Sequence, residues 1–415
     1  MAELNETRLY DTGISHGPGV LPTVPAMWSY SSLKEAEICP RRFALARADY
    51  PDLWAQHGYP RLPNLPAMKG DVVHGALQII VTALVTAGCV SPRTADAVTV
   101  LRDLGGYTAV AQRTLDEQLR RLDGNPRISA DRREQIDRAL SDWLPEAREQ
   151  IQSYLNRMTL HPHPAPAPTP TPAPVGAPTR LPAKRYPIRG GTHPERELVA
   201  AHLRVRGRVD VLSVDADGAE IMDTKTGAEA PTHRDQLRLY ALLWMDDRES
   251  NPDALPVTAL VAAYPDRDVV VPVPTEAELA DLRAEVTARV GRADAMVAAN
   301  RPAAVVGEQC GTCDVRGLCD EYWERGTPNT VDVVNGGWYD VEGTVLREHG
   351  VKSWVLREGR TGSNLLVRTP RPSFTLPVGE QVRILGVRRT IDPDEADALI
   401  ASLNSSSEIL SVVSG

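Results

Sequence analysis

The chain has 415 residues and a formal net charge of −9 at pH 7, with 42% hydrophobic and 24% charged residues. This composition is typical of a soluble globular protein with two or three domains, and the net charge does not by itself favour a nucleic-acid binder. The longest apolar run, Ala76 to Val90, contains Gln78 and two threonines and is shorter than the roughly 18 residues that a membrane-spanning helix needs. Met1 to Tyr10 lacks the basic and then apolar pattern of a secretory signal, so we expect a cytoplasmic protein.

The first predicted elements are helices. Tyr30 to Arg47 is predicted to be one helix with Ser29 or Ser31 as its N-cap, because a short hydroxyl side chain at that position accepts a backbone N–H. Asp71 is expected to cap a second helix that runs from Val72 to Thr86.

A helical region and a spacer follow. Apolar residues recur at helical spacing in residues 92–158, which predicts helices only. His161 to Pro182 contains nine prolines, and such a segment is expected to be an extended, poorly ordered spacer. Residues 1–27, which are punctuated by glycine and proline, are also expected to be loose.

After the spacer the hydrophobic period changes from helical to alternating, which predicts strands. The predicted strands are Glu197–Val205, Arg208–Val214, Ala219–Thr224, Val257–Tyr264 and Val269–Val273. Asp215 to Gly218 is typical of a hairpin turn. Two helices are predicted between and after these strands, at His233–Asp246 and Thr275–Ala299. The pattern therefore indicates an α/β fold with a mixed sheet flanked by helices.

The C-terminal part returns to short strands, which predicts a small β domain of about the right length for an OB-like barrel. These strands are Tyr339–Arg347, Lys352–Arg357, Asn364–Thr369 and Gln381–Arg389. Four aromatic residues of this part are expected either to stack on bases or to fill the core of the barrel: Trp338, Tyr339, Trp354 and Phe374. Two segments carry a local charge of +6, Arg180–Arg208 with eight basic and two acidic residues and Gly343–Thr390 with nine and three. Each is either a phosphate-binding surface or an ordinary solvated one.

Two carboxylates and a lysine are expected to meet on one hairpin. Asp223-Thr-Lys225 ends a predicted strand, and Asp210 lies on the strand before it. Either possible two-residue loop, Asp217-Gly218 or Ala216-Asp217, keeps all three side chains on one face, because the two registers differ by two residues. Directly opposed Cβ atoms lie about 4.5–5.5 Å apart, so carboxylates in these positions repel each other unless a cation neutralises them.

This arrangement has a chemical and a structural interpretation. Carboxylate oxygens with open positions suit Mg²⁺ or Mn²⁺, and a lysine beside them can orient or deprotonate the water that attacks a phosphodiester. The alternative is a surface hairpin with an ordinary Asp–Lys ion pair, and the residues alone leave both possibilities open.

Four of the five cysteines are candidate metal ligands. Cys310, Cys313 and Cys319 form a C-x2-C-x5-C run, and Cys39 stands far from them in the sequence. Thiolates at this spacing bind zinc or an iron–sulfur cluster, and in a reducing compartment disulfides are not expected. Cys89 lies in an apolar helix and is expected to be a small buried residue.

The ordered motifs resemble those of RecB-family nucleases of the PD-(D/E)XK superfamily. The catalytic motifs are Gly70-x-x-x-His74, Gly207-Arg-Val-Asp210, Asp223-x-Lys225 and Gln236-x-x-x-Tyr240. Ser31-x-Leu33 and Cys39-Pro40-x-x-Phe43, together with the distal cysteine run, match the iron–sulfur branch, which includes AddB-type helicase-nucleases and the RecB-like exonucleases of CRISPR adaptation. The resemblance covers roughly residues 28–325.

The resemblance implies a role for each motif residue. Asp210, Asp223 and the backbone carbonyl of Thr224 would bind the divalent metal, and His74 would bind it or lie beside it. Lys225 would activate the water and stabilise the charge that develops on the phosphate. Gln236 and Tyr240, one helical turn apart, would support the site or contact DNA. Glu197 on the preceding strand is not assigned a role.

The resemblance also implies cofactors, partners and a division of the chain. Cys39, Cys310, Cys313 and Cys319 would hold a [4Fe–4S] cluster that clasps the two ends of the nuclease domain. The implied function is a metal-dependent DNA nuclease, expected to act as an exonuclease on single-stranded DNA or DNA ends. The alternatives are a non-catalytic DNA-binding or scaffold subunit, and an inactive protein whose cysteines hold zinc.

No Walker A motif is present in the sequence, so a helicase or a defence complex is a possible protein partner, in DNA repair or anti-phage defence. The expected divisions are 1–27 (loose), 28–325 (nuclease: helical 70–158, spacer 161–182, sheet 195–300, cysteines 310–319) and 335–415 (OB-like).

Overall fold

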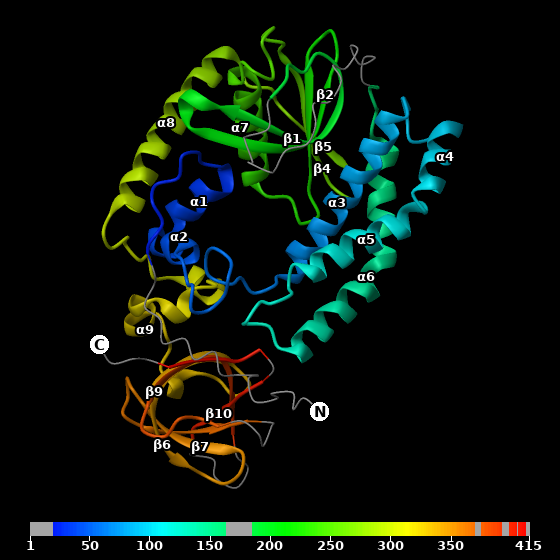
Figure 1. The fold of residues 1–415 in the computed structure, drawn as a ribbon. Coiled ribbons are helices and arrows are strands. Elements are labelled where there is room, and N and C mark those ends of the chain that lie inside the picture. Colours follow the sequence, from blue (N-terminus) through cyan, green and yellow to red (C-terminus); the bar gives the residue numbers. More distant parts are fainter. Residues whose placement is uncertain (1–19, 163–184, 370–374, 392–397, 405, 412–415) are drawn as a thin grey trace, which may run out of the picture.

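The computed structural model describes residues 20–162, 185–369, 375–391, 398–404 and 406–411. Residues 1–19 of the expected loose segment 1–27, residues 163–182 of the proline-rich spacer, and Phe374 lie outside the described residues. The described chain forms a helical layer, a five-stranded sheet with its own helices, and a C-terminal β-barrel (Figure 1).

The helices precede, flank and follow the sheet. Their bounds are α1 Tyr30–Ile38, α2 Pro40–Arg47, α3 Leu65–Thr86, α4 Ala95–Asp103, α5 Gly106–Arg120, α6 Ala130–Arg157, α7 Pro231–Asp246, α8 Glu276–Ala298 and α9 Asp320–Arg325. The strands of the first sheet are β1 Gly191–Ala200, β2 Val205–Val214, β3 Ala219–Thr224, β4 Val257–Ala263 and β5 Asp268–Val271.

The first sheet is covered by helices on both faces. Its strands lie in the order β1-β2-β3-β4-β5, and β3 and β4 form the parallel pair. Alternate residues of one strand point to opposite faces. Val211 and Met222 therefore pack with α3 to α6, while Leu212 and Ile221 pack with α1, α7 and α8. The expected mixed α/β fold is confirmed.

Three sequence predictions are corrected by the structure. The predicted single helix Tyr30–Arg47 is two helices separated by Cys39, because Pro40 disfavours a helical conformation in the residue before it and begins α2. Asn64, and not Asp71, caps α3 through a hydrogen bond from the backbone N–H of Ala67.

The third correction concerns the turn between the first two strands. The turn lies at Ala201–Leu203 and is followed by Arg204, which adopts a left-handed conformation with φ +56°. Strand β1 therefore ends at Ala200 instead of Val205, and it begins at Gly191 instead of Glu197.

Helix α3 is long and apolar enough by composition to cross a membrane, but 56% of that stretch is buried inside the protein. Its apolar side chains, among them Val72, Ile80 and Leu84, pack in the same cluster as α5 and α6. This packing is that of a core helix in a globular domain.

The C-terminal strands close into a barrel. They are β6 Trp338–Glu348, β7 Ser353–Glu358, β8 Asn364–Arg368, β9 Gln381–Thr390, β10 Ile400–Ser402 and β11 Glu408–Ser411. Five of them form the ring β6-β7-β8-β10-β9, in which β9 pairs again with β6 and only β8 and β10 are parallel. The expected OB-like barrel is confirmed, and sequence analysis missed the short strands β10 and β11.

The barrel places its aromatic residues in two environments. Tyr339 and Trp354 are buried in the barrel core, so for these two the core interpretation holds. Trp338 is 61% exposed, and the guanidinium of Arg388 lies 5.9 Å from its ring centroid.

The barrel packs on the loop that carries three cysteines. Gly317 of this loop fits against Leu385 and Leu410, and a Cβ at Gly317 would lie 2.8 Å from Leu410. Asp340 is buried and accepts hydrogen bonds from Arg316 Nε at 2.6 Å and from the Tyr322 hydroxyl at 2.7 Å. These contacts fix strands β6, β9 and β11 against the first part of the chain.

Candidate active site and cysteine centre

Three carboxylates lie side by side on three neighbouring strands. Val211 pairs with Met222, so the register places Asp210 beside Asp223, which is the arrangement expected for the Ala216-Asp217 loop. On the other side, Pro194 and Arg196 pair with Val211 and Val209, so Glu195 lies opposite Asp210. Antiparallel neighbours of this kind have side chains on one face, and the three acids therefore share one site.

Lys225 follows β3 and points into this site. Its ammonium forms an ion pair with Asp223 and donates a hydrogen bond to Gln236 Oε1 at 2.8 Å. Gln236 Nε2 in turn donates to the Tyr240 hydroxyl at 2.7 Å. The backbone of Lys225 is held on both sides, because its N–H donates to Ala263 and its carbonyl accepts from the Tyr154 hydroxyl at 2.9 Å.

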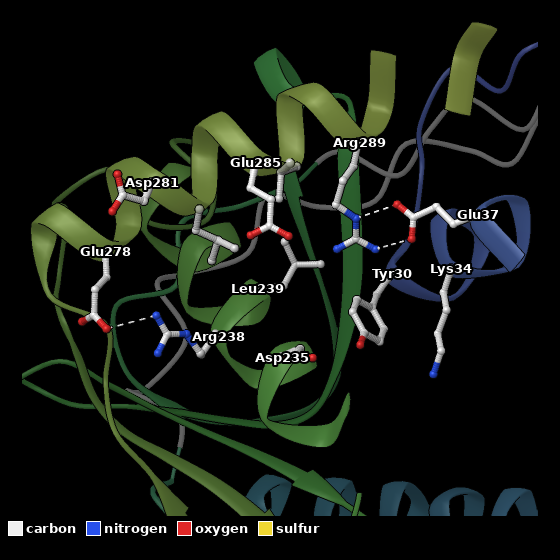
Figure 2. Close-up of a pocket in the computed structure, with 12 residues that line it drawn as sticks. Tyr30, Lys34, Glu37, Asp235, Arg238, Leu239, Glu278, Asp281, Glu285 and Arg289 are labelled. Carbon is white, nitrogen blue, oxygen red and sulfur yellow. Dashed lines mark hydrogen bonds and ion pairs between the residues drawn. The ribbon is translucent and has the colours of Figure 1, made fainter. Parts of the chain in front are cut away.

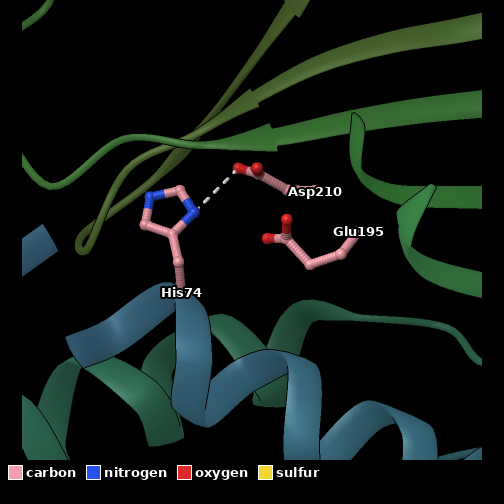
Figure 3. Close-up of side chains that lie close together, drawn as sticks. All are labelled: His74, Glu195 and Asp210. Carbon is pink, nitrogen blue, oxygen red and sulfur yellow. Dashed lines mark ion pairs between the residues drawn. The ribbon is translucent and has the colours of Figure 1, made fainter. Parts of the chain in front are cut away.

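His74 approaches the acids from α3. Its Nδ1 lies 3.2 Å from Asp210 Oδ2 and 3.1 Å from Thr224 Oγ1. Thr224 donates to the same Asp210 oxygen twice, from its N–H at 2.6 Å and its hydroxyl at 2.7 Å. Figure 3 shows His74 pointing from its helix towards Asp210, with the carboxylate of Glu195 beside them. His74 of α3 and Thr224 of β3 thus both contact the carboxylate of Asp210 on β2.

Burial and the neighbouring charges raise the pKa values of Asp223 and His74 and lower that of Asp210. Burial and the neighbouring Asp210 carboxylate together raise the pKa of Asp223 to about 7, although the Lys225 ammonium offsets part of their effect. Burial also tends to raise the pKa of Asp210, but the ion pair with His74 and the Thr224 hydrogen bonds hold it below its usual value. For His74 burial lowers the pKa, and the attraction of Asp210 outweighs this and raises it to about 9.

Glu195 is the site residue that the sequence analysis missed. Its φ is +53°, a left-handed conformation that few non-glycine residues adopt and that is often retained at functional sites. Burial and the nearby Asp210 raise its pKa. The register of the β1–β2 hairpin is the signal that would have found it, once the turn is placed at Ala201–Leu203. Glu197 lies instead on the exposed part of β1 beside Arg206, at 3.5 Å.

The residues fit a divalent cation. Ligand atoms of His74, Glu195 and Asp210 lie within 4.8 Å of one another. Asp223 Oδ2 is buried, and its partner is the ammonium of Lys225. Oxygen ligands with a histidine nearby suit Mg²⁺ or Mn²⁺, and a cation would neutralise the repulsion among the three acids.

The glycine of the Gly207-x-x-Asp210 motif has a packing reason. A Cβ at Gly207 would lie 2.6 Å from Cε1 of Tyr240 and 2.9 Å from Leu243. Strand β2 therefore needs glycine at this position so that the Tyr240 ring can lie against it. The ring position in turn places the hydroxyl that holds Gln236 and, through it, Lys225.

The structure also brings Cys39 to the distal cysteines. Cys39 Sγ accepts hydrogen bonds from the N–H of Arg42 at 3.4 Å and of Val305 at 3.5 Å, and Cys310 Sγ lies 3.8 Å from the Val305 carbonyl. Cys313 and Cys319 are buried nearby in one hydrophobic cluster. Cys89 lies in the separate cluster of the helical layer, as expected for a buried structural residue.

The thiols are spaced more widely than in a compact metal site. Burial raises the pKa of Cys313, and it raises that of Cys319 to about 11, so a bound cation is needed to hold them as thiolates. Zinc with bonds of about 2.3 Å draws its sulfurs close together. Among the described residues no three cysteine sulfurs lie within 4.8 Å of one another.

A pocket of about 440 Å³ lies apart from the candidate site, between α1, α7 and α8 (Figure 2). Two ion pairs cross it, Arg289 with Glu37 at 2.7 Å and Arg238 with Glu278 at 3.2 Å. None of the motif residues lines this pocket.

Comparisons with known proteins assign most of the chain to a protein family. A model of the PD-(D/E)XK nuclease superfamily matches residues 27–320. No curated protein matches the sequence.

Among solved structures, an OB domain from Methanosarcina mazei is 19% identical, covers 21% of this chain and 84% of its own, and has a TM-score of 0.18. A murine DNA-binding protein bound to double-stranded DNA is 12% identical, with coverage of 37% and 63% and a TM-score of 0.19. Because the family model spans more than half of the sequence, the chain belongs to the PD-(D/E)XK nuclease superfamily.

Proposed function

We propose that this protein is a divalent-metal-dependent DNA nuclease of the RecB-like iron–sulfur branch. The observation that carries the proposal is the buried group of Asp210, Asp223 and Lys225, on adjoining strands, with His74 and Glu195 beside it. Membership of the nuclease superfamily supports a phosphodiesterase reaction. We further propose an exonuclease that acts on single-stranded DNA or DNA ends.

Each residue has a defined task in this proposal. Asp210, Asp223 and the Thr224 carbonyl would hold Mg²⁺ or Mn²⁺, with His74 and Glu195 as further ligands. When bound, the metal supplies a Lewis acid for the phosphate and lowers the pKa of water. Lys225 would orient the attacking water and stabilise the negative charge that grows on the phosphate oxygens.

Gln236 and Tyr240 are positioning residues. The chain of hydrogen bonds from Tyr240 to Gln236 to Lys225 fixes the ammonium in the site. Since a side chain that is held in one position loses little entropy when the substrate binds, this relay would keep Lys225 aligned for the reaction.

The four cysteines are proposed to hold a [4Fe–4S] cluster with a structural role. The C-x2-C-x5-C run with Cys39 as a distant fourth cysteine is the pattern of the iron–sulfur branch that the sequence motifs resemble. The cluster would join Cys39 to the loop after α8, and its binding energy would count towards folding.

The competing proposal is a non-catalytic DNA-binding or scaffold subunit. A site that has lost its function should also lose the costly features of the active form. Here three carboxylates, of which Asp223 is buried and Glu195 and Asp210 are half-buried, a left-handed Glu195 and a half-buried lysine are all retained. The nuclease is therefore favoured.

The first prediction tests the role of Lys225. Lys225→Ala should lower the rate of cleavage of labelled single-stranded DNA, with Mg²⁺ or Mn²⁺, by about 10²–10⁴-fold, because it removes the group that orients the water. Lys69→Ala is the matched control. It also removes a lysine, but the ammonium of Lys69 lies over the Trp143 ring, 5.0 Å from its centroid, and not beside the carboxylates. Equal activity of Lys225→Ala and the wild type, or no cleavage by the wild type, contradicts the assignment.

The second prediction concerns stability and pH in the metal-free protein. The folded-state pKa of Asp223 is raised to about 7, so protonation of Asp223 stabilises the fold at low pH, and this contribution is lost as the pH rises through about 7. The melting temperature of the wild type should fall from about pH 5 to about pH 8.

Asp223→Asn should lack most of the part of this fall that lies below about pH 6.5, because the loss of the His74 contribution, with its folded-state pKa of about 9, begins only above that pH. Mn²⁺ should reduce the fall in the wild type. Thermal unfolding followed by circular dichroism measures both. If the melting temperatures of the wild type and Asp223→Asn change with pH in the same way, Asp223 is not the carboxylate whose raised pKa causes the fall.

The third prediction tests the cysteine centre. Protein purified without oxygen should be brown and contain about four iron atoms per chain. Cys39→Ser should lose the colour and the iron, whereas Cys89→Ser, its control, should keep both. A colourless wild type with one zinc per chain would rule out the cluster.

A further inference from the structure

A cavity of about 590 Å³ beside helix α3 has no assigned role. It is lined by the loop that joins α2 to α3, by the first turns of α3, and by the end of α5 with the residues that follow it (Figure 1). Asp71 of α3 lines the cavity, and His74 of the candidate site lies three residues further on the same side of this helix. The charge of Asp71 also contributes to the raised pKa of Glu195. The cavity therefore lies next to the candidate site.

Hydrogen bonds hold the walls of this cavity in place. The N–H of Tyr59 donates to the Ala46 carbonyl at 3.1 Å, and Asn125 Nδ2 donates to the Arg61 carbonyl at 2.8 Å. Gly58 has a φ of +81°, and a Cβ there would lie 2.7 Å from the carbonyl oxygen of Ala46. This tight turn needs glycine, and the loop is thereby fixed against α2 and against the segment after α5.

A tryptophan of this loop lines the cavity. Trp54 is half-buried, and its indole N–H donates to the Gly58 carbonyl at 2.7 Å. The polar group of the indole is therefore satisfied by its own loop, and the ring is held in one position. Bases of single-stranded nucleic acids stack on aromatic rings that are presented in this way.

A buried amide lines the same cavity. Gln118 of α5 is only 8% exposed, and its amide has no hydrogen-bond partner among the residues that the structure describes. A buried amide without a partner costs free energy. A carboxamide offers a donor and an acceptor side by side, and the Watson–Crick edge of every natural base offers the complementary pair. A nucleobase would therefore satisfy Gln118.

The charges around the cavity nearly balance. Its lining includes three arginines and two aspartates, an excess of one positive charge with histidine counted as neutral: Arg47, Arg61, Arg121, Asp71 and Asp314. A nearly neutral cavity with an aromatic ring and an amide suits an uncharged base better than a phosphate. Arg61 is exposed and, within the described ranges, forms no ion pair, so it can contact a phosphate next to that base.

We propose that this cavity binds one unpaired base of a single-stranded DNA substrate, stacked on Trp54 and hydrogen-bonded to the amide of Gln118. The inference deepens the proposed function and rests on it for the choice of DNA. The bound base would fix the strand beside the nuclease site. Because base pairing occupies the Watson–Crick edge, a paired base could not bind Gln118, and the cavity would favour single strands over duplexes.

The test is a binding titration of the full-length protein in EDTA, where no divalent cation supports cleavage. The probes are two fluorescent strands of about 20 nucleotides, oligo(dT) and a strand of abasic nucleotides of the same length. Trp54→Ala should weaken the binding of oligo(dT) about tenfold, the loss expected for one stacked base. It should leave the affinity for the abasic strand and the salt dependence of binding unchanged, because no phosphate contact is removed.

Two further variants separate binding from folding. Gln118→Leu should weaken the binding of oligo(dT) about threefold without lowering the melting temperature, because an apolar side chain of similar size replaces a buried amide that has no partner. Gln112→Leu on the same helix is its control, since the Gln112 amide donates to Asp116 at 2.8 Å and does not line the cavity. Trp54→Phe keeps an aromatic ring, should retain most of the affinity, and shows whether the loop still folds.

Three results would overturn the inference. One is an unchanged affinity of Trp54→Ala for oligo(dT), another is an equal loss of affinity for oligo(dT) and for the abasic strand, and the third is an equal loss for duplex DNA. Each would show that Trp54 does not stack on an unpaired base.

Cleavage of single-stranded DNA with Mn²⁺ separates this inference from the proposed function. If the wild type is inactive but Trp54→Ala loses the base-dependent part of binding, the inference stands and the nuclease does not. If the wild type is active and Trp54→Ala has the same KM and the same affinity, the nuclease stands and the inference does not. When both hold, Trp54→Ala should raise KM about tenfold and change kcat little.

Discussion

The repulsion among three closely spaced carboxylates, of which Asp223 is buried and Glu195 and Asp210 are half-buried, is the constraint on which the site depends. Glu195, Asp210 and Asp223 lie on consecutive strands, and the sheet register brings them together. Burying charge without a partner costs several kcal/mol per ion by general estimates. Lys225 and His74 supply part of the compensation, but the pKa of Asp223 is still raised to about 7. A divalent cation would supply the rest, and for this reason we propose that one binds here.

The packing around the site fixes the position of the Lys225 ammonium beside the carboxylates. Gly207 lets the ring of Tyr240 lie against β2, Tyr240 holds Gln236, and Gln236 holds Lys225. Tyr154 of α6 fixes the carbonyl of Lys225 from the other face of the sheet. Helices α6 and α7 therefore do more than cover the sheet, because their contacts determine where the ammonium of Lys225 lies.

The loop that carries Cys310, Cys313 and Cys319 lies between helix α2 and the barrel. Cys313 of this loop lies near Cys39, at the junction of α1 and α2, and Gly317 and Arg316 contact the barrel. The proposed cluster in this loop would contact both the nuclease domain and the segment on which the barrel packs. Cluster binding and the placement of the barrel would thereby be linked through one short segment.

The sequence predicted the parts of the site that depend on local geometry. Asp210, Asp223 and Lys225 belong to one hairpin, and both possible loops put them on one face. Glu195 was missed because the β1–β2 turn contains no glycine, proline or asparagine at Ala201–Leu203, so alternation alone does not locate it. The cap of α3 was misplaced because Asn64 precedes Leu65-Pro66, where a proline in the first turn is easily taken for a break.

The tertiary features were beyond the sequence for a different reason. Burial of Tyr339 and Trp354 and exposure of Trp338 depend on how the barrel closes. Strands β10 and β11 are short and gain their stability from pairing with β8 and β9. Such choices are made by long-range contacts, which periodicity does not report.

The most direct test of the central claim is the affinity for Mn²⁺, measured by calorimetry at about pH 8, where Asp223 is ionised in the metal-free protein. The wild type should bind Mn²⁺, and Asp210→Asn should bind it at least about tenfold more weakly. Asp266→Asn, which changes an exposed carboxylate paired with Arg267, should bind as the wild type does. Equal Mn²⁺ affinity in the wild type and Asp210→Asn would contradict the claim that these buried carboxylates form a metal site.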